Sequence, residues 1–175
     1  VTYKVLKSHY SDKSSELWDE EYKNKNSAAV ESLRLANEKQ IEFFRWIQWQ
    51  IFEQMTLIKK YATGKGIYII GDLPFLVSSD SADVWAHPEY FRKDLSSGAP
   101  PDMYFSKGQR WGMPPYNWDA IANDGYDFIK ERLKYASNFY DMYRIDHFVG
   151  LFRIWTIKNE KPLELAGLEG EFLPN

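Results

Sequence analysis

Cysteine is absent from the 175-residue sequence. Without thiols the chain has no disulfide bonds and no thiolate ligands for a metal. The absence fits a reducing compartment such as the cytoplasm and is also compatible with secretion. Long apolar runs are also missing, because none approaches the roughly 20 residues that a membrane-spanning helix needs. Residues 1–25 lack the basic start and apolar middle of a signal peptide. We therefore expect a cytoplasmic protein without a membrane partner.

An excess of basic charge is missing too. The 22 Lys and Arg residues are outnumbered by 25 Asp and Glu residues, and they are spread along the chain rather than clustered. Because nucleic acids and anionic membranes are recognised by basic patches, neither is expected as a partner, and a neutral ligand fits better. No H-x-x-x-H or D-x-D spacing indicates a metal site, and "TGKG" (63–66) precedes a strand, which is the wrong context for a phosphate-binding loop. No metal or cofactor is expected.

Aromatic residues, in contrast, are abundant, with 7 Trp, 12 Tyr and 11 Phe. One interpretation is a large aromatic core. The other is sugar recognition, since the C–H faces of a sugar stack on aromatic rings while its hydroxyl groups bind polar side chains around them. Aromatic residues in polar loops favour the second interpretation, and we select Trp111, between Arg110 and Gly112, as a sugar-stacking platform.

The hydrophobic pattern predicts an alternation of helices and strands. Apolar residues recur three and four apart from Ser27 to about Ala62, which indicates one long helix or two shorter ones. Short apolar runs predict strands over residues 67–71 and 140–145. Between the strands we expect a long loop over residues 71–117, which holds six of the eight prolines, and an amphipathic helix over residues 118–137. The polar segment from Lys158 onward is interpreted as a solvated tail.

This order of elements is a βαβ unit, which places the two strands side by side and parallel in an α/β fold. Two parallel strands cannot bury their own faces. The chain therefore belongs to a larger α/β barrel or doubly wound sheet, or needs a partner that completes its sheet. In both architectures functional groups gather at the carboxyl ends of the strands. We expect Asp72 and Asp146, which end the two runs, to lie at the same end of the sheet.

Arg144 and Asp146 are two residues apart, so on an extended strand their side chains share a face. One interpretation is a buried ion pair that closes a core. A second is a carboxylate that the neighbouring guanidinium keeps ionised, as a nucleophile requires. A third is a metal site through Asp146 and His147, which the lack of further ligands disfavours. Asp72, before Leu-Pro, can also be a simple turn residue.

Three longer blocks are more specific: "GIYIIGDLPFLVSSDSADVWAHPEYF", "GAPPDMYFSKGQRWGMPPYNW" and "YRIDHFVGLFRIW". In order and spacing they resemble the 4-alpha-glucanotransferases (amylomaltases, disproportionating enzymes) of glycoside hydrolase family 77, over roughly residues 38–157. The resemblance implies part of a catalytic (β/α)8 TIM barrel. It also implies an enzyme that cleaves an α-1,4-glucan, holds the glycosyl piece covalently and passes it to the 4-hydroxyl of another sugar.

The resemblance implies roles for individual residues as well. Asp146 falls on the nucleophile of the family and Arg144 on the arginine that orients it. His147 falls on a histidine that contacts the sugar beside the cleaved bond, and Asp72 on an aspartate at the end of the preceding barrel strand. The residues that resemble those lining the glucan groove are Asp102, Tyr104, Phe105, Gln109 and Trp111. Two positions depart from the family pattern: Met113 stands where many relatives have Asn, and Met103 splits the usual Asp-Tyr-Phe run.

The resemblance further implies that residues 1–175 are a fragment of the barrel, incomplete on the C-terminal side and on the N-terminal side. A retaining mechanism needs a second carboxylic acid about 5 to 5.5 Å from the nucleophile. In the family this glutamate lies on a later strand. The glutamates after Asp146 all lie in the polar tail: Glu160, Glu164, Glu169 and Glu171. We expect a glucanotransferase whose isolated fragment is inactive. The alternatives are a noncatalytic glucan-binding fragment and an α-glucan hydrolase of a related barrel family.

Overall fold

The computed structural model describes residues 1–174, which fall into two compact units. The first unit comprises residues 1–69 and 138–141, and the second comprises residues 70–137 and the chain from residue 142 onward. No helix among residues 1–174 is both long enough and apolar enough to cross a membrane.

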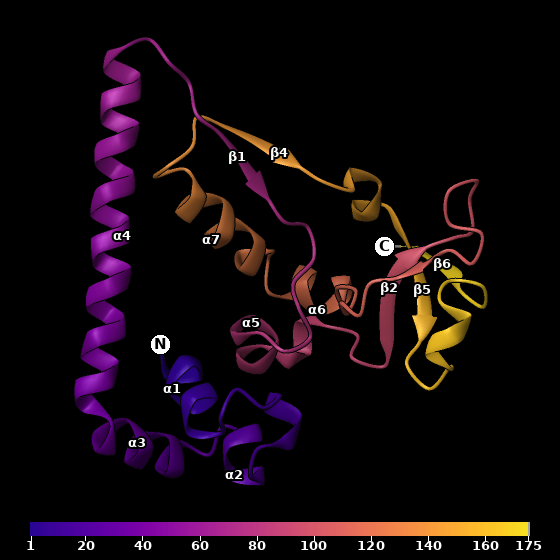
Figure 1. The fold of residues 1–175 in the computed structure, drawn as a ribbon, viewed down its shortest axis with the longest axis horizontal. Coiled ribbons are helices and arrows are strands. Elements are labelled where there is room, and N and C mark those ends of the chain that lie inside the picture. Colours follow the sequence, from indigo (N-terminus) through magenta and orange to yellow (C-terminus); the bar gives the residue numbers. More distant parts are fainter. Residues whose placement is uncertain (175) are drawn as a thin grey trace. The chain divides into compact units, whose positions relative to one another are not determined.

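The first unit is helical (Figure 1). Asn26 begins the third of its helices, because its Oδ1 accepts hydrogen bonds from the backbone N–H groups of Ala28 and Ala29, which have no partner within the helix. That helix ends at Asn37, whose Nδ2 donates to the carbonyl of Leu33 at 2.9 Å. The predicted helical span is therefore confirmed, as two helices. The elements are α1 (Thr2–His9), η1 (Ser15–Leu17), α2 (Glu20–Lys23), α3 (Ser27–Ala36) and α4 (Glu38–Gly64).

Two segments of the first unit that are distant in sequence, around Ile69 and around Asp141, bind each other. Ile69 N–H donates to Asp141 Oδ2 and Asp141 N–H donates to the Ile69 carbonyl, each at 2.9 Å. Lys59 Nζ of α4 donates to the carbonyl of Tyr140, also at 2.9 Å. These contacts join α4 to both segments from which the parallel strands continue.

The second unit contains a parallel pair of strands, β1 (Ile70–Leu73) and β4 (Met142–Ile145), in a register that pairs Asp72 with Arg144. The prediction of adjacent parallel strands is therefore confirmed. β1 starts later than expected, because Gly66 turns the chain with a φ of 71° and the next residues remain outside the ladder. Asp72 consequently lies within β1 rather than after it.

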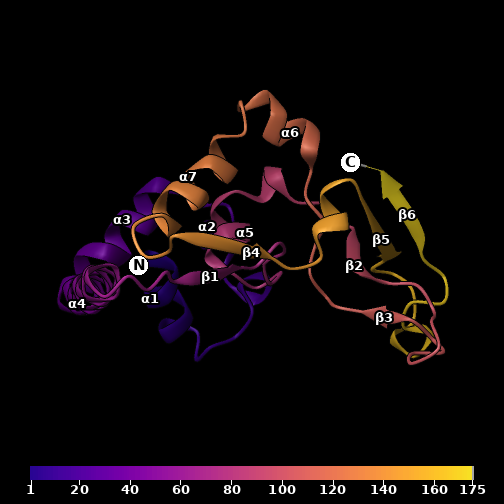
Figure 2. The same ribbon diagram turned by 90° about the horizontal axis from the view of Figure 1, so that it is seen from above.

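A second sheet was not predicted. It is antiparallel with the strand order β3-β2-β5-β6, seen from above in Figure 2. β2 has no hydrophobic signature because it is built of small residues: Ser96 and Ser97 are buried, and a Cβ on Gly98 would come within 2.1 Å of the Gln109 carbonyl oxygen. The strands of this sheet are β2 (Leu95–Ala99), β3 (Gln109–Arg110), β5 (Arg153–Lys158) and β6 (Glu171–Pro174). The prediction of a loop over residues 71–117 is wrong at β2 and β3, and β5 was not predicted; in the polar tail, β6 forms a strand whose residues are mostly exposed.

A helix covers one face of the parallel pair. Tyr143 Oη of β4 donates to the carbonyl of Leu133 in α7 at 3.0 Å, so α7 packs on the face opposite Arg144, since side chains alternate along a strand. The single helix predicted over residues 118–137 is two, because Gly125 and Tyr126 take left-handed φ values of 64° and 65° between them. The helical elements of this unit are α5 (Ala82–Ala86), η2 (Pro88–Tyr90), α6 (Trp118–Asn123), α7 (Asp127–Ala136), η3 (Phe148–Leu151) and η4 (Leu163–Leu165).

The described chain is thus a mixed α/β fold with one parallel and one antiparallel sheet. A buried cluster includes residues of α5 and α6 and packs against residues of η2 and α7: Val84, Phe91, Tyr116 and Ile121. Phe75, which follows β1, packs against this cluster. The loop after β1 is therefore anchored to the same core as the helices.

Replacing Ile121 by alanine should destabilise the protein. Ile121 is 0% exposed, so truncation leaves a cavity as well as losing buried apolar area. We expect the free energy of unfolding to fall by about 2 to 5 kcal/mol in urea titration. Met103, which is 87% exposed, provides the control, because Met103→Ala removes a similar side chain that packs on little. Equal losses in the two variants would contradict this description of the core.

Candidate active site

The polar face of the parallel pair carries two carboxylates joined by one guanidinium. Arg144 Nη1 donates to both oxygens of Asp72, at 3.0 Å and 2.9 Å. Its Nη2 donates to Asp146 Oδ1 at 2.8 Å. The prediction that the two aspartates meet at one end of the sheet is therefore confirmed, with Arg144 between them.

These ion pairs orient side chains more than they stabilise the fold. The side chains of Arg144, Asp72 and Asp146 are 59%, 61% and 70% exposed. Water screens such pairs, which typically contribute about 1 kcal/mol or less each. Charge-assisted contacts of this geometry nevertheless fix the planes of the groups that they join. The alternative of a buried pair that closes a core is wrong for the described chain, because all three side chains are open to solvent.

A cavity of about 320 Å³ adjoins the two aspartates. Of the predicted site residues, Asp72, Asp146, Trp111 and His147 line it. His147 directly follows Asp146 with a left-handed φ of 51°, which turns the chain out of the strand. Its ring meets that of Trp111 edge to face, with centroids 5.0 Å apart. Its Nε2 is buried and has no hydrogen-bond partner among the described residues.

The antiparallel sheet holds Trp111 at the edge of this cavity. Its backbone N–H donates to the carbonyl of Ser97 in β2 at 2.8 Å, and the next residue, Gly112, donates to Ser96 Oγ at 2.9 Å. Trp111 Nε1 donates to Gln109 Oε1 at 3.0 Å. Gln109 therefore reaches the site through the indole of Trp111 rather than by lining the cavity.

Three other predicted residues lie outside this cavity. Asp102 Oδ1 accepts hydrogen bonds from the backbone N–H groups of Tyr104 at 2.8 Å and Phe105 at 2.6 Å, which closes a tight turn. The two aromatic residues are 82% and 51% exposed. None of the three lines the cavity beside Asp146. Their contact with a glucan stays a prediction.

Several functional neighbours gave no signal in the sequence. Pro74, Phe75 and Leu76 line the cavity, although nothing in the apolar run after β1 marks them as site residues; Met113, which departs from the family pattern, also lines it. Gly150 had a signal, because glycine within an apolar run often marks a close approach. A Cβ there would come within 2.7 Å of both the Phe75 ring and the His147 ring.

Within residues 1–174 the site includes no metal cluster and no carboxylic acid besides Asp72 and Asp146. No group of three or more His, Cys, Asp or Glu side chains in this part of the chain could hold a metal ion. The cavity lining includes no glutamate. Of the tail glutamates, Glu169 pairs with Lys161, while Glu171 begins β6.

Comparison with known proteins gives a consistent result. The family model of glycoside hydrolase family 77, described as 4-alpha-glucanotransferase, matches residues 1–170. The 4-alpha-glucanotransferase of Chlamydia muridarum is 50% identical over 117 residues, which are 67% of this chain and 22% of that protein. That of Thermus thermophilus is 36% identical over 156 residues, 86% of this chain and 31% of that protein. The chain therefore spans less than a third of the length of these two relatives.

Solved structures agree. An amylomaltase from Streptococcus agalactiae, in complex with acarbose, superposes with a TM-score of 0.92 at 31% identity, over 99% of this chain and 36% of that one. An amylomaltase from Corynebacterium glutamicum superposes with a TM-score of 0.76 at 24% identity, which supports the fold alone.

Adding a methyl group at Gly150 should disturb the cavity wall. In Gly150→Ala the new Cβ would overlap the rings of Phe75 and His147, so one of them must move. We expect a loss of about 1 to 3 kcal/mol in the free energy of unfolding, measured by urea titration. Gly64→Ala is the matched control, because a Cβ at Gly64 meets nothing within 4 Å. A Gly150→Ala protein as stable as this control would show that the wall is not close-packed.

Proposed function

Because the chain belongs to the 4-alpha-glucanotransferase family, glycoside hydrolase family 77, we propose that it forms part of an enzyme that transfers α-1,4-glucan segments. The acceptor is the 4-hydroxyl of another glucan or of glucose. The observation that carries the proposal is the Asp72–Arg144–Asp146 arrangement at the carboxyl ends of two parallel strands, beside a cavity that Trp111 also lines.

Asp146 is the proposed nucleophile of a retaining double displacement. Arg144 binds only its Oδ1, so Oδ2 keeps its lone pairs free of hydrogen bonds from the described residues. In the first step a carboxylate oxygen attacks the anomeric carbon, and the bond to the leaving glucan breaks as a glycosyl ester forms. In the second step the acceptor 4-hydroxyl gives its proton to the acid/base group of the reaction, attacks the same carbon and displaces Asp146. Both steps invert the anomeric centre, so the product retains the α linkage.

Arg144 serves as an orienting group in this proposal, since it fixes one carboxylate oxygen and thereby the direction of the other. Asp72 accepts hydrogen bonds from Nη1 of the same guanidinium, and at the cavity it accepts hydrogen bonds from sugar hydroxyl groups. His147 and Trp111 offer ring surface to the glycosyl unit beside the cleaved bond. We assign more distant glucan contacts to the loop that contains Asp102, Tyr104, Phe105 and Gln109. The acarbose complex of the similar S. agalactiae amylomaltase supports an oligosaccharide ligand.

The acid and base of the reaction is proposed to lie outside residues 1–175. A leaving glucan oxygen needs a proton from a second carboxylic acid about 5 to 5.5 Å from the nucleophile. The lining of the cavity within the described chain offers only Asp72 and Asp146, which share one guanidinium. We therefore propose that residues 1–175 are a fragment of a (β/α)8 barrel. The missing glutamate would come from a further strand of that barrel.

The nucleophile is tested in the complete enzyme that carries this chain. Asp146→Asn should abolish nearly all transfer from maltotriose, because an amide of the same shape cannot form the glycosyl ester. Asp94→Asn is the matched control: Asp94 also pairs with an arginine, Arg92, at 2.9 Å, but does not line the cavity. The control should keep its activity. More than a few percent of wild-type activity in Asp146→Asn would contradict the assignment.

The same assay separates the alternatives by the products of the unaltered enzyme. Transfer from maltotriose gives longer oligosaccharides along with shorter ones, whereas hydrolysis gives shorter ones only. Binding of maltotriose without any product would instead favour a noncatalytic glucan-binding protein.

A further inference from the structure

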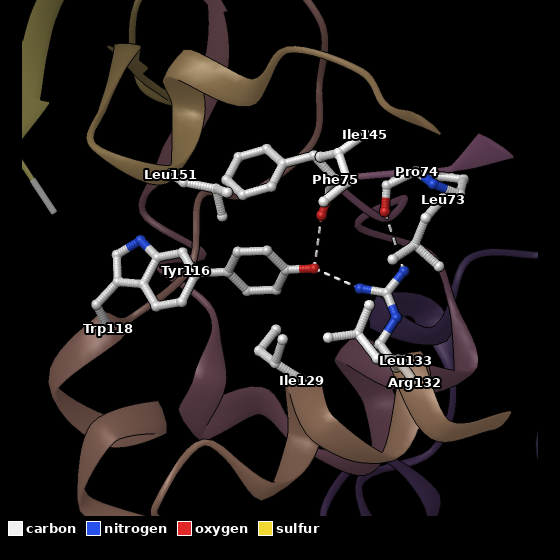
Figure 3. A pocket seen from close by; sticks show the side chains of 10 residues that line it. All are labelled: Leu73, Pro74, Phe75, Tyr116, Trp118, Ile129, Arg132, Leu133, Ile145 and Leu151. Carbon is white, nitrogen blue, oxygen red and sulfur yellow. Dashed lines mark hydrogen bonds between the residues drawn. The ribbon is translucent and has the colours of Figure 1, made fainter. Parts of the chain in front are cut away.

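Behind the site, two side chains from different elements bind the backbone of the loop that follows β1 (Figure 3). Arg132 of α7 donates from Nη1 to Tyr116 Oη at 2.6 Å and from Nη2 to the carbonyl of Pro74 at 3.1 Å. Tyr116 Oη lies 2.7 Å from the carbonyl of Phe75. An arginine can only donate and a carbonyl can only accept, so the hydroxyl accepts from Arg132 and donates to Phe75. We call Tyr116 and Arg132 the clamp.

The clamp lies at an apolar cavity of about 150 Å³, where few other polar groups compete with it for the carbonyls of Pro74 and Phe75. Tyr116 is only 3% exposed, and this burial raises the pKa of its hydroxyl, so the donor to Phe75 remains protonated. Empty space beside Pro74 and Phe75 means that packing alone cannot fix their backbone on that side. Losing the clamp would leave two carbonyls without partners in an apolar setting.

Pro74 and Phe75 form the wall between this cavity and the candidate active site, because they are the two residues that line both cavities. The Phe75 ring meets Tyr116 edge to face on one side, with centroids 5.5 Å apart. The Phe75 ring also adjoins Gly150, where the His147 ring approaches as well. The rings of Phe75 and His147 thus both border Gly150, and Asp72 lies only two residues before Pro74, so the position of the Phe75 backbone bears on both site residues.

We propose that Tyr116 and Arg132 are positioning residues for glucan transfer: they hold the Pro74–Phe75 wall so that His147 and Asp72 meet the reacting sugar correctly. The inference rests on the proposed function. Neither residue lines the cavity beside Asp146, so both act through the wall rather than on the substrate.

The test compares two removals of one hydroxyl in the complete enzyme. Tyr116→Phe cuts the bond to Phe75 and leaves the ring in place. Tyr143→Phe is the matched control, because Tyr143 Oη also donates to a backbone carbonyl in this unit, that of Leu133 at 3.0 Å, but Tyr143 lines neither cavity and does not bind Pro74 or Phe75. We expect Tyr116→Phe to lower kcat for maltotriose about tenfold with KM within about twofold, since misplacement of a reacting group by about 1 Å can cost about 100-fold. Tyr143→Phe should keep the wild-type kcat, whatever its stability.

Arginine variants provide the second arm, which does not depend on the folding of Tyr116→Phe. Lysine can reach one of the two partners of Arg132 but not both, so kcat should fall from wild type to Arg132→Lys and further to Arg132→Met. Because the clamp acts as a unit, the double variant Tyr116→Phe/Arg132→Met should lose no more kcat than the worse single variant. A kcat within about twofold of wild type in Arg132→Met would overturn the proposal.

A spectroscopic readout separates this inference from the proposed function. The imidazole NMR signals of His147, assigned by their loss in His147→Asn, should shift in Tyr116→Phe and in Arg132→Lys and stay in place in Tyr143→Phe. Unmoved signals in the clamp variants would overturn the inference even if kcat fell. If the unaltered enzyme transfers no glucan, the proposed function fails, and the His147 signals alone then decide whether the clamp positions the wall.

Discussion

The site depends on a positive charge placed between two negative ones. The parallel register of β1 and β4 sets Asp72 opposite Arg144, with Asp146 two residues further along the same strand. Two carboxylates brought this close would repel each other without a cation between them. The forked guanidinium of Arg144 suits this position, because it binds one carboxylate through Nη1 and the other through Nη2. A lysine would offer a point charge without such a fixed geometry.

Two segments of the second unit flank this group of charges, the one around Trp111 and the one that follows β1. Side chains from elsewhere in the unit bind the backbone of each segment. Ser96 of β2 accepts from Gly112, beside the indole that faces His147. Arg132 and Tyr116 bind the carbonyls that follow β1. In both places the segment that reaches the cavity is irregular, and its position comes from a regular element nearby. Loops at a site can hold a defined shape when a rigid scaffold binds their backbone in this way.

The sequence predicted the centre of this arrangement better than its surroundings. Asp72, Arg144 and Asp146 were placed together because strand alternation and parallel pairing follow from local patterns. The contribution of Phe75, Tyr116 and Arg132 could not be predicted, because it consists of contacts between elements that are distant in sequence. β2 was missed for a different reason: its serines and glycine are buried because they are small, not because they are apolar. The break between α6 and α7 depends on two successive left-handed residues, Gly125 and Tyr126, and only the glycine is typical of that conformation.

Successive side chains of β4 point to opposite faces of the sheet, so the number of residues in this strand matters as much as their identity. Arg144 and Asp146 face the candidate site, whereas Ile145 lines the apolar cavity behind it. A deletion of one residue within β4 would exchange the two faces, and would bring an aliphatic side chain to the site and carboxylates to an apolar cavity. The turn at residues 102–105 has no such restriction, because its length does not set the phase of a strand. Over evolutionary time, insertions and deletions should therefore accumulate in that turn and be eliminated from residues 142–146.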